Sequence, residues 1–177
     1  MTISLAIDTS TSRTIVGLVD GEKVLFEEYS EGATDHGRAV SELVAKALAN
    51  RPQPEQVVVG MGPGPFTGLR VGIAFARTFA LAREIPVIGI CSLDAIEINR
   101  QSYTVAIDAR RKEIYWAKYV DGVRVEGPSV NKPDEVNEFI VDQYPSAARL
   151  VALADHQNAT EPFYLRRPDA VPTAERG

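Results

Sequence analysis

The sequence is poor in the residues that build disulfides and metal sites. Cys91 is the only cysteine among 177 residues, so neither an internal disulfide nor a cysteine-based zinc site can form. His36 and His156 are isolated from one another, so we expect no metal site and interpret His36 as a surface or interface group. Nothing approaches the ~18 apolar residues that cross a bilayer, and Asp8 follows too short an apolar stretch for a signal peptide. We expect a cytoplasmic protein that does not contact a membrane.

An excess of basic residues is also absent. The chain has 19 lysines and arginines against 24 aspartates and glutamates, which gives a formal net charge of −5. Proteins that bind nucleic acid unaided usually carry a basic face, because neutralising phosphates supplies most of the affinity. We therefore expect no autonomous binding of RNA or DNA. With 45% hydrophobic and 24% charged residues, the composition is that of one globular domain or two small lobes.

Apolar periodicity in the first half predicts strands that alternate with helices. The expected strands are 3–7, 14–19, 23–29, 56–59 and 86–90, and the expected helices are 36–50 and 68–84. This order is typical of an α/β sheet with parallel members. In the second half, Pro133 and Asp134 predict the start of a helix, and residues 149–154 predict a last strand. Beyond Arg167 we expect a loose tail.

The most informative pattern is an internal repeat. AIDTSTSRTIVGLVDGEKV begins at Ala6 and AIDARRKEIYWAKYVDGVRV begins at Ala106, and each holds a strand, an aspartate, a polar turn and an Asp-Gly hairpin. We interpret the repeat as a duplicated lobe in which Asp8 and Asp108 end equivalent strands and face one another. Two unrelated hairpins are the alternative. The lobes would then cover residues 1–101 and 102–177.

The densest glycine cluster is GMGPGPFTGLRVG, residues 60–72. It matches neither the Walker A loop nor the dinucleotide fingerprint. A tight loop that enters a helix, with Thr67 as N-cap and Arg70 in the first turn, suits an anion. The glycines could equally serve only a sharp turn and close packing. We weigh these two interpretations equally.

Small residues recur at every fourth position of the second expected helix. The residues are Gly68, Gly72, Ala76 and Ala80. Without large side chains on this line, another helix can approach closely. That helix is either the first helix of this chain or part of a partner chain, and the sequence does not separate the two.

A polar turn follows the first strand. Asp8, Thr9 and Ser10 could bind a phosphate or Mg²⁺ through one carboxylate and several hydroxyls, and Asp108 would complete the site across a cleft. The alternative is ordinary turn chemistry, because aspartate, serine and threonine often cap strand ends.

Several blocks together closely resemble the TsaB (YeaZ) family of bacteria. They are residues 3–14, GMGPGPFTGLRVG, IPVIGICSLDAI, AIDARRKEIYWAKY and PFYLRR, in the same order over nearly the whole chain. The resemblance implies an α/β fold of the duplicated actin/Hsp70/sugar-kinase-like (ribonuclease H-like) type, with two lobes. Because chains of this family are commonly longer, the second lobe is expected to be trimmed between about Asp142 and Pro162.

The resemblance also implies a role in making threonylcarbamoyladenosine beside the anticodon of tRNAs that read codons beginning with adenine. The chain would be a non-catalytic scaffold that pairs with the transferase TsaD, and the ATPase TsaE would join them. tRNA would bind only through the complex. No cofactor is implied for this chain alone, and ATP or ADP could lie at the complex interface. A homodimer in the absence of TsaD stays open. The implied interface residues lie on the two helices: His36, Val40, Gly68, Leu69, Arg70, Gly72, Ala76 and Ala80.

The alternative function is a free-standing ATPase or small-molecule kinase that uses Asp8 and Asp108. The second half has no glycine between Gly127 and Gly177, so it lacks the glycine-rich turn that contacts adenosine in this superfamily. A peptidase would need a nucleophile–base pair or zinc ligands, and neither is visible. These points favour the scaffold.

Overall fold

The first half of the chain forms a five-stranded sheet. The computed structural model describes residues 1–32 and 34–166. The sheet has the strand order β3-β2-β1-β4-β5. Its strands are β1 (Ile3–Asp8), β2 (Arg13–Asp20), β3 (Lys23–Glu31), β4 (Gln56–Gly60) and β5 (Val87–Ile90). The first three are antiparallel neighbours, and β1, β4 and β5 run parallel because helices connect them.

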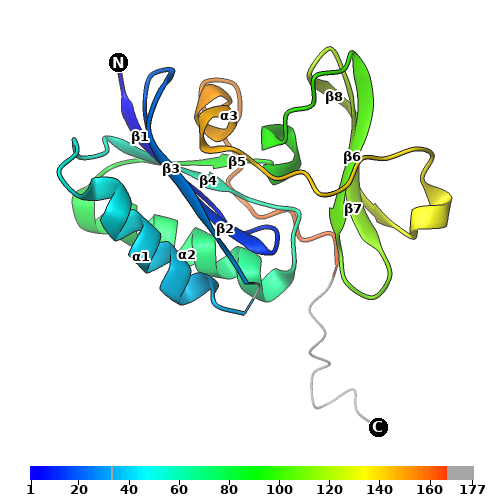
Figure 1. Cartoon of the computed structure of the whole chain (residues 1–177), viewed down its shortest axis with the longest axis horizontal. Helices are drawn as coiled ribbons and strands as arrows, with labels where there is room; N and C mark the ends of the chain where they lie inside the picture. The colour runs from blue at the N-terminus through cyan, green and yellow to red at the C-terminus, as the bar shows by residue number, and fades with distance from the viewer. Residues whose placement is uncertain (33, 167–177) are drawn as a thin grey trace, which may run out of the picture.

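Helices cover both faces of this sheet, as Figure 1 shows. The helices α1 (His36–Leu48) and α2 (Phe66–Arg83) pack on one face, and the short helix α3 (Ala147–Ala152) packs on the other. In β4, Val57 and Val59 contact the α1–α2 side, whereas Val58 contacts the α3 side. Alternate side chains therefore enter two separate cores, which explains why the central strands are apolar at nearly every position.

The second half opens with a smaller sheet that repeats the first meander. Its strands β6 (Ser102–Asp108), β7 (Ile114–Val120) and β8 (Val123–Asn131) are antiparallel neighbours in the order β6-β7-β8. Asp8 ends β1 opposite Ile15, and Asp108 ends β6 opposite Ile114. The prediction of a duplicated α/β fold is confirmed.

Two expected elements of the second half are wrong. Residues 149–154 do not form a strand: α3 ends at Ala152 and a turn follows it. Ser146 accepts a hydrogen bond from the Arg149 amide, so its side chain caps the N-terminus of α3. The short apolar run by itself resembles a strand. The helix expected at Pro133 is only the 3-10 turn η2 (Pro133–Glu135), and Ile140 beyond it forms a β-bridge with Val105 instead.

The end of the described chain returns to the first sheet. At Gly17 of β2 a Cβ atom would overlap Ala147 of α3, so glycine allows this close approach. The Ala159 amide donates to the Gly89 carbonyl at 2.7 Å, and the Phe163 amide donates to the Met61 carbonyl at 2.8 Å. The chain from α3 to Phe163 thus packs on the first lobe although it follows the second sheet, and Leu165 and Arg166 then contact the second lobe. The tail expected beyond Arg167 lies outside the described residues.

A buried carboxylate joins the two sheets. Asp94, in the 3-10 helix η1 (Ser92–Ala95), accepts hydrogen bonds from the Tyr119 hydroxyl at 2.7 Å and from Arg124 Nε at 2.9 Å. Gln157 Nε2 donates to the same carboxylate at 2.8 Å. The network holds β7, β8 and the returning chain end against the connection between the lobes. Within the part of the chain that the structure describes, no helix is both long and apolar enough to span a bilayer.

Candidate functional site

The polar turn after β1 points into the protein. Asp8 is fully buried, and its Oδ1 accepts hydrogen bonds from the Ser10 amide at 2.8 Å and the Ser10 hydroxyl at 2.6 Å. Burial raises the pKa of Asp8 above its ordinary value of 3.8, and this effect outweighs the neighbouring hydroxyls of Ser10 and Ser92, which favour the charged form. The carboxyl group is therefore a poor candidate for a metal ligand or a solvent-facing base.

The Thr9 side chain hydrogen-bonds to the backbone of α2. Its hydroxyl donates to the Gly68 carbonyl at 2.7 Å and accepts from the Gly72 amide at 3.1 Å. These two backbone groups are the ones that an undisturbed helix would pair with each other. The threonine side chain therefore bridges one turn of α2 and fixes the polar turn to that helix.

A second link reaches the start of α1. The Thr14 hydroxyl and His36 Nδ1 lie 2.7 Å apart, and His36 is only 4% exposed. Burial lowers the pKa of His36, although the nearby Asp8 and Asp35 act in the opposite direction. The expectation that His36 is a surface or interface group is corrected, because its ring packs between β2 and α2.

The glycine cluster makes room for this turn. A Cβ on Gly60 would overlap the Asp8 carboxyl, and one on Gly72 would overlap the Thr9 side chain. A Cβ on Gly64 would lie 2.5 Å from the Ser10 carbonyl oxygen, and one on Gly68 would lie 3.0 Å from the His36 ring. Close packing, one of the two interpretations of GMGPGPFTGLRVG, therefore explains the glycines. Thr67 is not the N-cap, because α2 begins at Phe66 after Pro65.

The expected interface residues lie almost entirely inside this chain. On α2, Arg70 is exposed, whereas the rest of the predicted set is buried. The buried residues are His36, Val40, Gly68, Leu69, Gly72, Ala76 and Ala80. The line of small residues faces Thr9 and the core of its own lobe, so a partner chain cannot occupy it without unfolding that contact.

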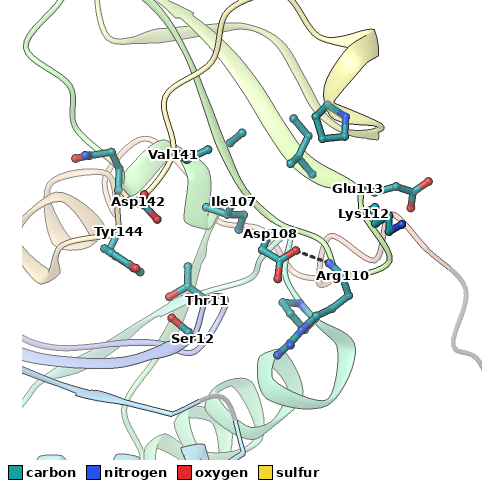
Figure 2. A pocket seen from close by; sticks show the side chains of 15 residues that line it. Thr11, Ser12, Ile107, Asp108, Arg110, Lys112, Glu113, Val141, Asp142 and Tyr144 are labelled. Carbon is teal, nitrogen blue, oxygen red and sulfur yellow. Dashed lines mark hydrogen bonds between the residues drawn. The ribbon is translucent and has the colours of Figure 1, made fainter.

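A cavity of about 550 Å³ lies between the lobes. Thr11, Ser12 and Pro65 line it from the first lobe, and Asp108, Arg110 and Lys112 are among the residues that line it from the second (Figure 2). Asp108 is exposed there, and its Oδ1 accepts from the Arg110 amide at 2.9 Å, the same turn that Asp8 makes with Ser10. The volume is in the range of small-molecule sites.

The expected phosphate-binding set is not brought together in one open site. Asp8, Thr9 and Ser10 are buried and bonded inward, whereas Asp108 faces the cavity. The prediction that Asp8 and Asp108 face one another across a cleft is corrected, because only Thr11 and Ser12 of the first polar turn reach the cavity. Within the described residues, no three His, Cys, Asp or Glu side chains gather where they could hold a metal ion.

Sequence reasoning missed Ser92 and Asp94. The Ser92 hydroxyl accepts from the Gly62 amide at 3.0 Å beside the Asp8 carboxyl, and Asp94 holds the lobes together. The available signal was their position, because two polar residues interrupt the apolar run VIGICSLDAI directly after a buried strand. Their partners are 25 or more residues away in the sequence, so spacing alone did not reveal them.

Comparison with known proteins gives consistent matches. Residues 30–171 match the model of a family described as TsaD, tRNA N6-adenosine threonylcarbamoyltransferase. An uncharacterized protein of Mycobacterium tuberculosis is 40% identical over 96% of this chain and 94% of its own length. The tRNA threonylcarbamoyladenosine biosynthesis protein TsaB of Haemophilus influenzae is 35% identical over 66% of this chain.

The relatives differ in the share of their own length that this chain matches. The match spans 53% of the Haemophilus influenzae protein and 57% of an uncharacterized relative from Mycobacterium leprae. The solved structure of YeaZ from Pseudomonas aeruginosa has a TM-score of 0.75 and 24% identity, covering 88% of this chain and 91% of that one. This structural likeness supports the duplicated fold alone.

A double-mutant cycle tests the Thr9 contact with α2. Gly72→Ala should lower the free energy of unfolding by ~1–3 kcal/mol, because its Cβ overlaps Thr9. Thr9→Ala should cost ~1–3 kcal/mol, since two backbone groups lose a partner. In the double variant the overlap is relieved, so we expect a loss smaller than the sum by ~0.5–3 kcal/mol, measured by chemical denaturation.

The matched control for this cycle is Gly37→Ala in α1. No atom lies within 4 Å of a Cβ built there, so the substitution should leave stability unchanged or raise it by up to ~1 kcal/mol. If the losses of unfolding free energy from Thr9→Ala and Gly72→Ala are additive, the Thr9 side chain does not contact the α2 backbone at Gly72.

The buried Asp8 carboxyl predicts a pH dependence of stability. Between its ordinary value of 3.8 and its raised folded pKa, folded Asp8 keeps a proton that the unfolded chain releases. Its contribution to stability is therefore complete at low pH and declines as pH rises through this window. Asp8→Asn cannot titrate, so its stability relative to the parent should increase from pH 4 toward neutrality. Denaturation series at several pH values measure this difference, and a constant difference would contradict the raised pKa.

Proposed function

The chain belongs to the tRNA N6-adenosine threonylcarbamoyltransferase family, and we propose that it is a non-catalytic subunit of the transferase complex. Within the family it is one of the TsaB (YeaZ) proteins. Its role lies in tRNA threonylcarbamoyladenosine biosynthesis. We further propose that the chain works in the cytoplasm, pairs with TsaD and contacts TsaE and tRNA only within the complex.

The inward polar turn is the observation that carries the non-catalytic role. Asp8 is buried with a raised pKa, and the Thr9 hydroxyl is bonded to two backbone groups of α2. A phosphate bound between the lobes would need these groups to face the cavity, and none of them lines it. These residues do not fit a nucleotide phosphate, so we assign this chain alone no cofactor and no reaction step.

The outer faces of α1 and α2 support the pairing role. The two helices pack side by side on one face of the sheet and are not covered by any other described element (Figure 1). Leu81, on the outer side of α2, is 81% exposed and offers an apolar side chain to a partner. We therefore place the TsaD contact on this outer face, in place of the buried small-residue line.

Reconstitution tests the proposal directly. The readout is threonylcarbamoyladenosine in a tRNA transcript incubated with threonylcarbamoyl-adenylate, TsaD and TsaE from the same organism, with or without this chain. We expect modification to require the chain and to survive Asp8→Asn, because Asp8 touches no reacting atom. The chain alone should hydrolyse no ATP above the protein-free rate.

ATP turnover by the isolated chain that disappears in Asp8→Asn would instead establish the free-standing ATPase or kinase. Modification that proceeds equally well without the chain would remove it from the complex. The parent and the variant are compared at a temperature where thermal melting shows both to be folded, so that an unfolded variant is not mistaken for an inactive one.

A further inference from the structure

The turn between β6 and β7 presents charged side chains to the cavity between the lobes. Asp108, Arg110 and Lys112 line the cavity from this turn, and Asp142 lines it from the segment that follows the second sheet (Figure 2). All four residues are exposed. In the other copy of the repeat, by contrast, Asp8 is fully buried. Of the two equivalent turns, the second is therefore the one that a ligand in the cavity can reach.

The backbone of this second turn has an unusual conformation. The successive residues Arg110, Arg111 and Lys112 have φ angles of 63°, 53° and 62°. This left-handed region is rarely adopted by residues other than glycine. The Glu113 amide closes the turn by donating to the Arg110 carbonyl oxygen at 3.0 Å. In the turn after β1, which the structure describes in full, no φ is positive. Such left-handed residues concentrate at ligand-binding and active sites.

The charges that line the cavity cancel without pairing with one another. Glu113 also lines it, but forms an ion pair with Arg166 near the end of the described chain. The remaining charged residues are two cations and two carboxylates: Arg110, Lys112, Asp108 and Asp142. Among the described residues, no ion pair involves any of these four. The cavity therefore offers both signs of charge to a ligand.

Apolar side chains form a further part of the lining. Ile107 of β6, Ile114 of β7 and Val141 contribute to it from the second half of the chain. Val141 is 46% exposed, so its apolar surface is open to a ligand. The volume of about 550 Å³ is in the range of sites for small organic molecules. A ligand that uses the whole lining carries both charges and an apolar group.

We infer that the cavity between the lobes binds a small zwitterion with an apolar side chain, either an apolar α-amino acid or a dipeptide of such residues. Arg110 and Lys112 bind its carboxylate, because a guanidinium group can donate two parallel hydrogen bonds to a carboxylate. Asp108 and Asp142 bind its ammonium group. The apolar lining contacts its side chain. This binding goes beyond the proposed function and does not depend on pairing with TsaD.

Ligands with a single sign of charge fit this lining less well. A free phosphate or a nucleotide would bring its negative charges near Asp108 and Asp142. A polyamine would bring its positive charges near Arg110 and Lys112. Like charges brought together disfavour the wrong ligand. A zwitterion can instead place each of its charges beside the opposite charge of the protein.

NMR titrations of the full chain test the class of ligand. The zwitterions are L-leucine, L-phenylalanine and the dipeptide leucyl-leucine, and comparing them distinguishes an amino acid from a dipeptide. N-acetyl-leucine lacks the ammonium group and leucinamide lacks the carboxylate, so these two compounds are the single-charge controls. We expect each control to bind at least tenfold more weakly than L-leucine. Inorganic phosphate and ATP are titrated in parallel.

Single substitutions test the site. Arg110→Gln and Asp108→Asn should each raise the Kd of the best-bound zwitterion at least tenfold, and the asparagine keeps an oxygen that can accept from the Arg110 amide. Lys118→Gln and Glu126→Gln are matched controls, because they remove exposed charges of the same signs that do not line this cavity. These controls should bind like the parent. Thermal melting checks the folding of every variant, and Asp142→Asn replaces Asp108→Asn if the latter unfolds.

Several outcomes would overturn the zwitterion site. One is that no zwitterion of the panel binds the parent chain. Another is that N-acetyl-leucine, leucinamide, phosphate or ATP binds as tightly as the best zwitterion. Equal Kd values for the folded cavity variants and their matched controls would also overturn it. Because these titrations use the chain alone, failure to bind TsaD would contradict the proposed function and leave the cavity result unchanged.

Discussion

A single hydroxyl group constrains much of the first lobe. Thr9 lies between the Gly68 carbonyl and the Gly72 amide, so the turn after β1 is fixed to α2 by the helix backbone. This contact requires glycine at position 72, and the adjoining contacts of the turn require small residues at 60 and 64. The glycine-rich motif therefore leaves the space that the turn after β1 fills, and the two segments pack together.

The same constraint determines what the site can do. With Asp8 and Ser10 bonded inside the protein, only Thr11 and Ser12 of the polar turn reach the cavity between the lobes. The buried Asp94 network then holds the second sheet and the returning chain end in place. The outer face of α1 and α2 stays exposed on this lobe, and we place the partner there.

The sequence predicted the repeat, the α/β order and the importance of residues 60–72, because hydrophobic periodicity and glycine spacing are local signals. It did not predict that the Asp8 carboxyl is buried and does not face the cavity, because this burial depends on contacts with Gly60 and Ser92 across the sheet. The α3 helix was missed for a related reason: six residues are too few for a clear period, and Ala147 is fixed by Gly17 far away in the sequence.

The most direct test of the central claim is amide hydrogen exchange of this chain with and without TsaD, followed by mass spectrometry. Peptides from α1 and α2 report on the proposed partner face, and peptides from β6, β7 and β8 report on the second lobe. We predict slower exchange in residues 36–48 and 66–83 on complex formation and no change in residues 102–131. Slower exchange confined to residues 102–131, with both helices unchanged, would contradict it.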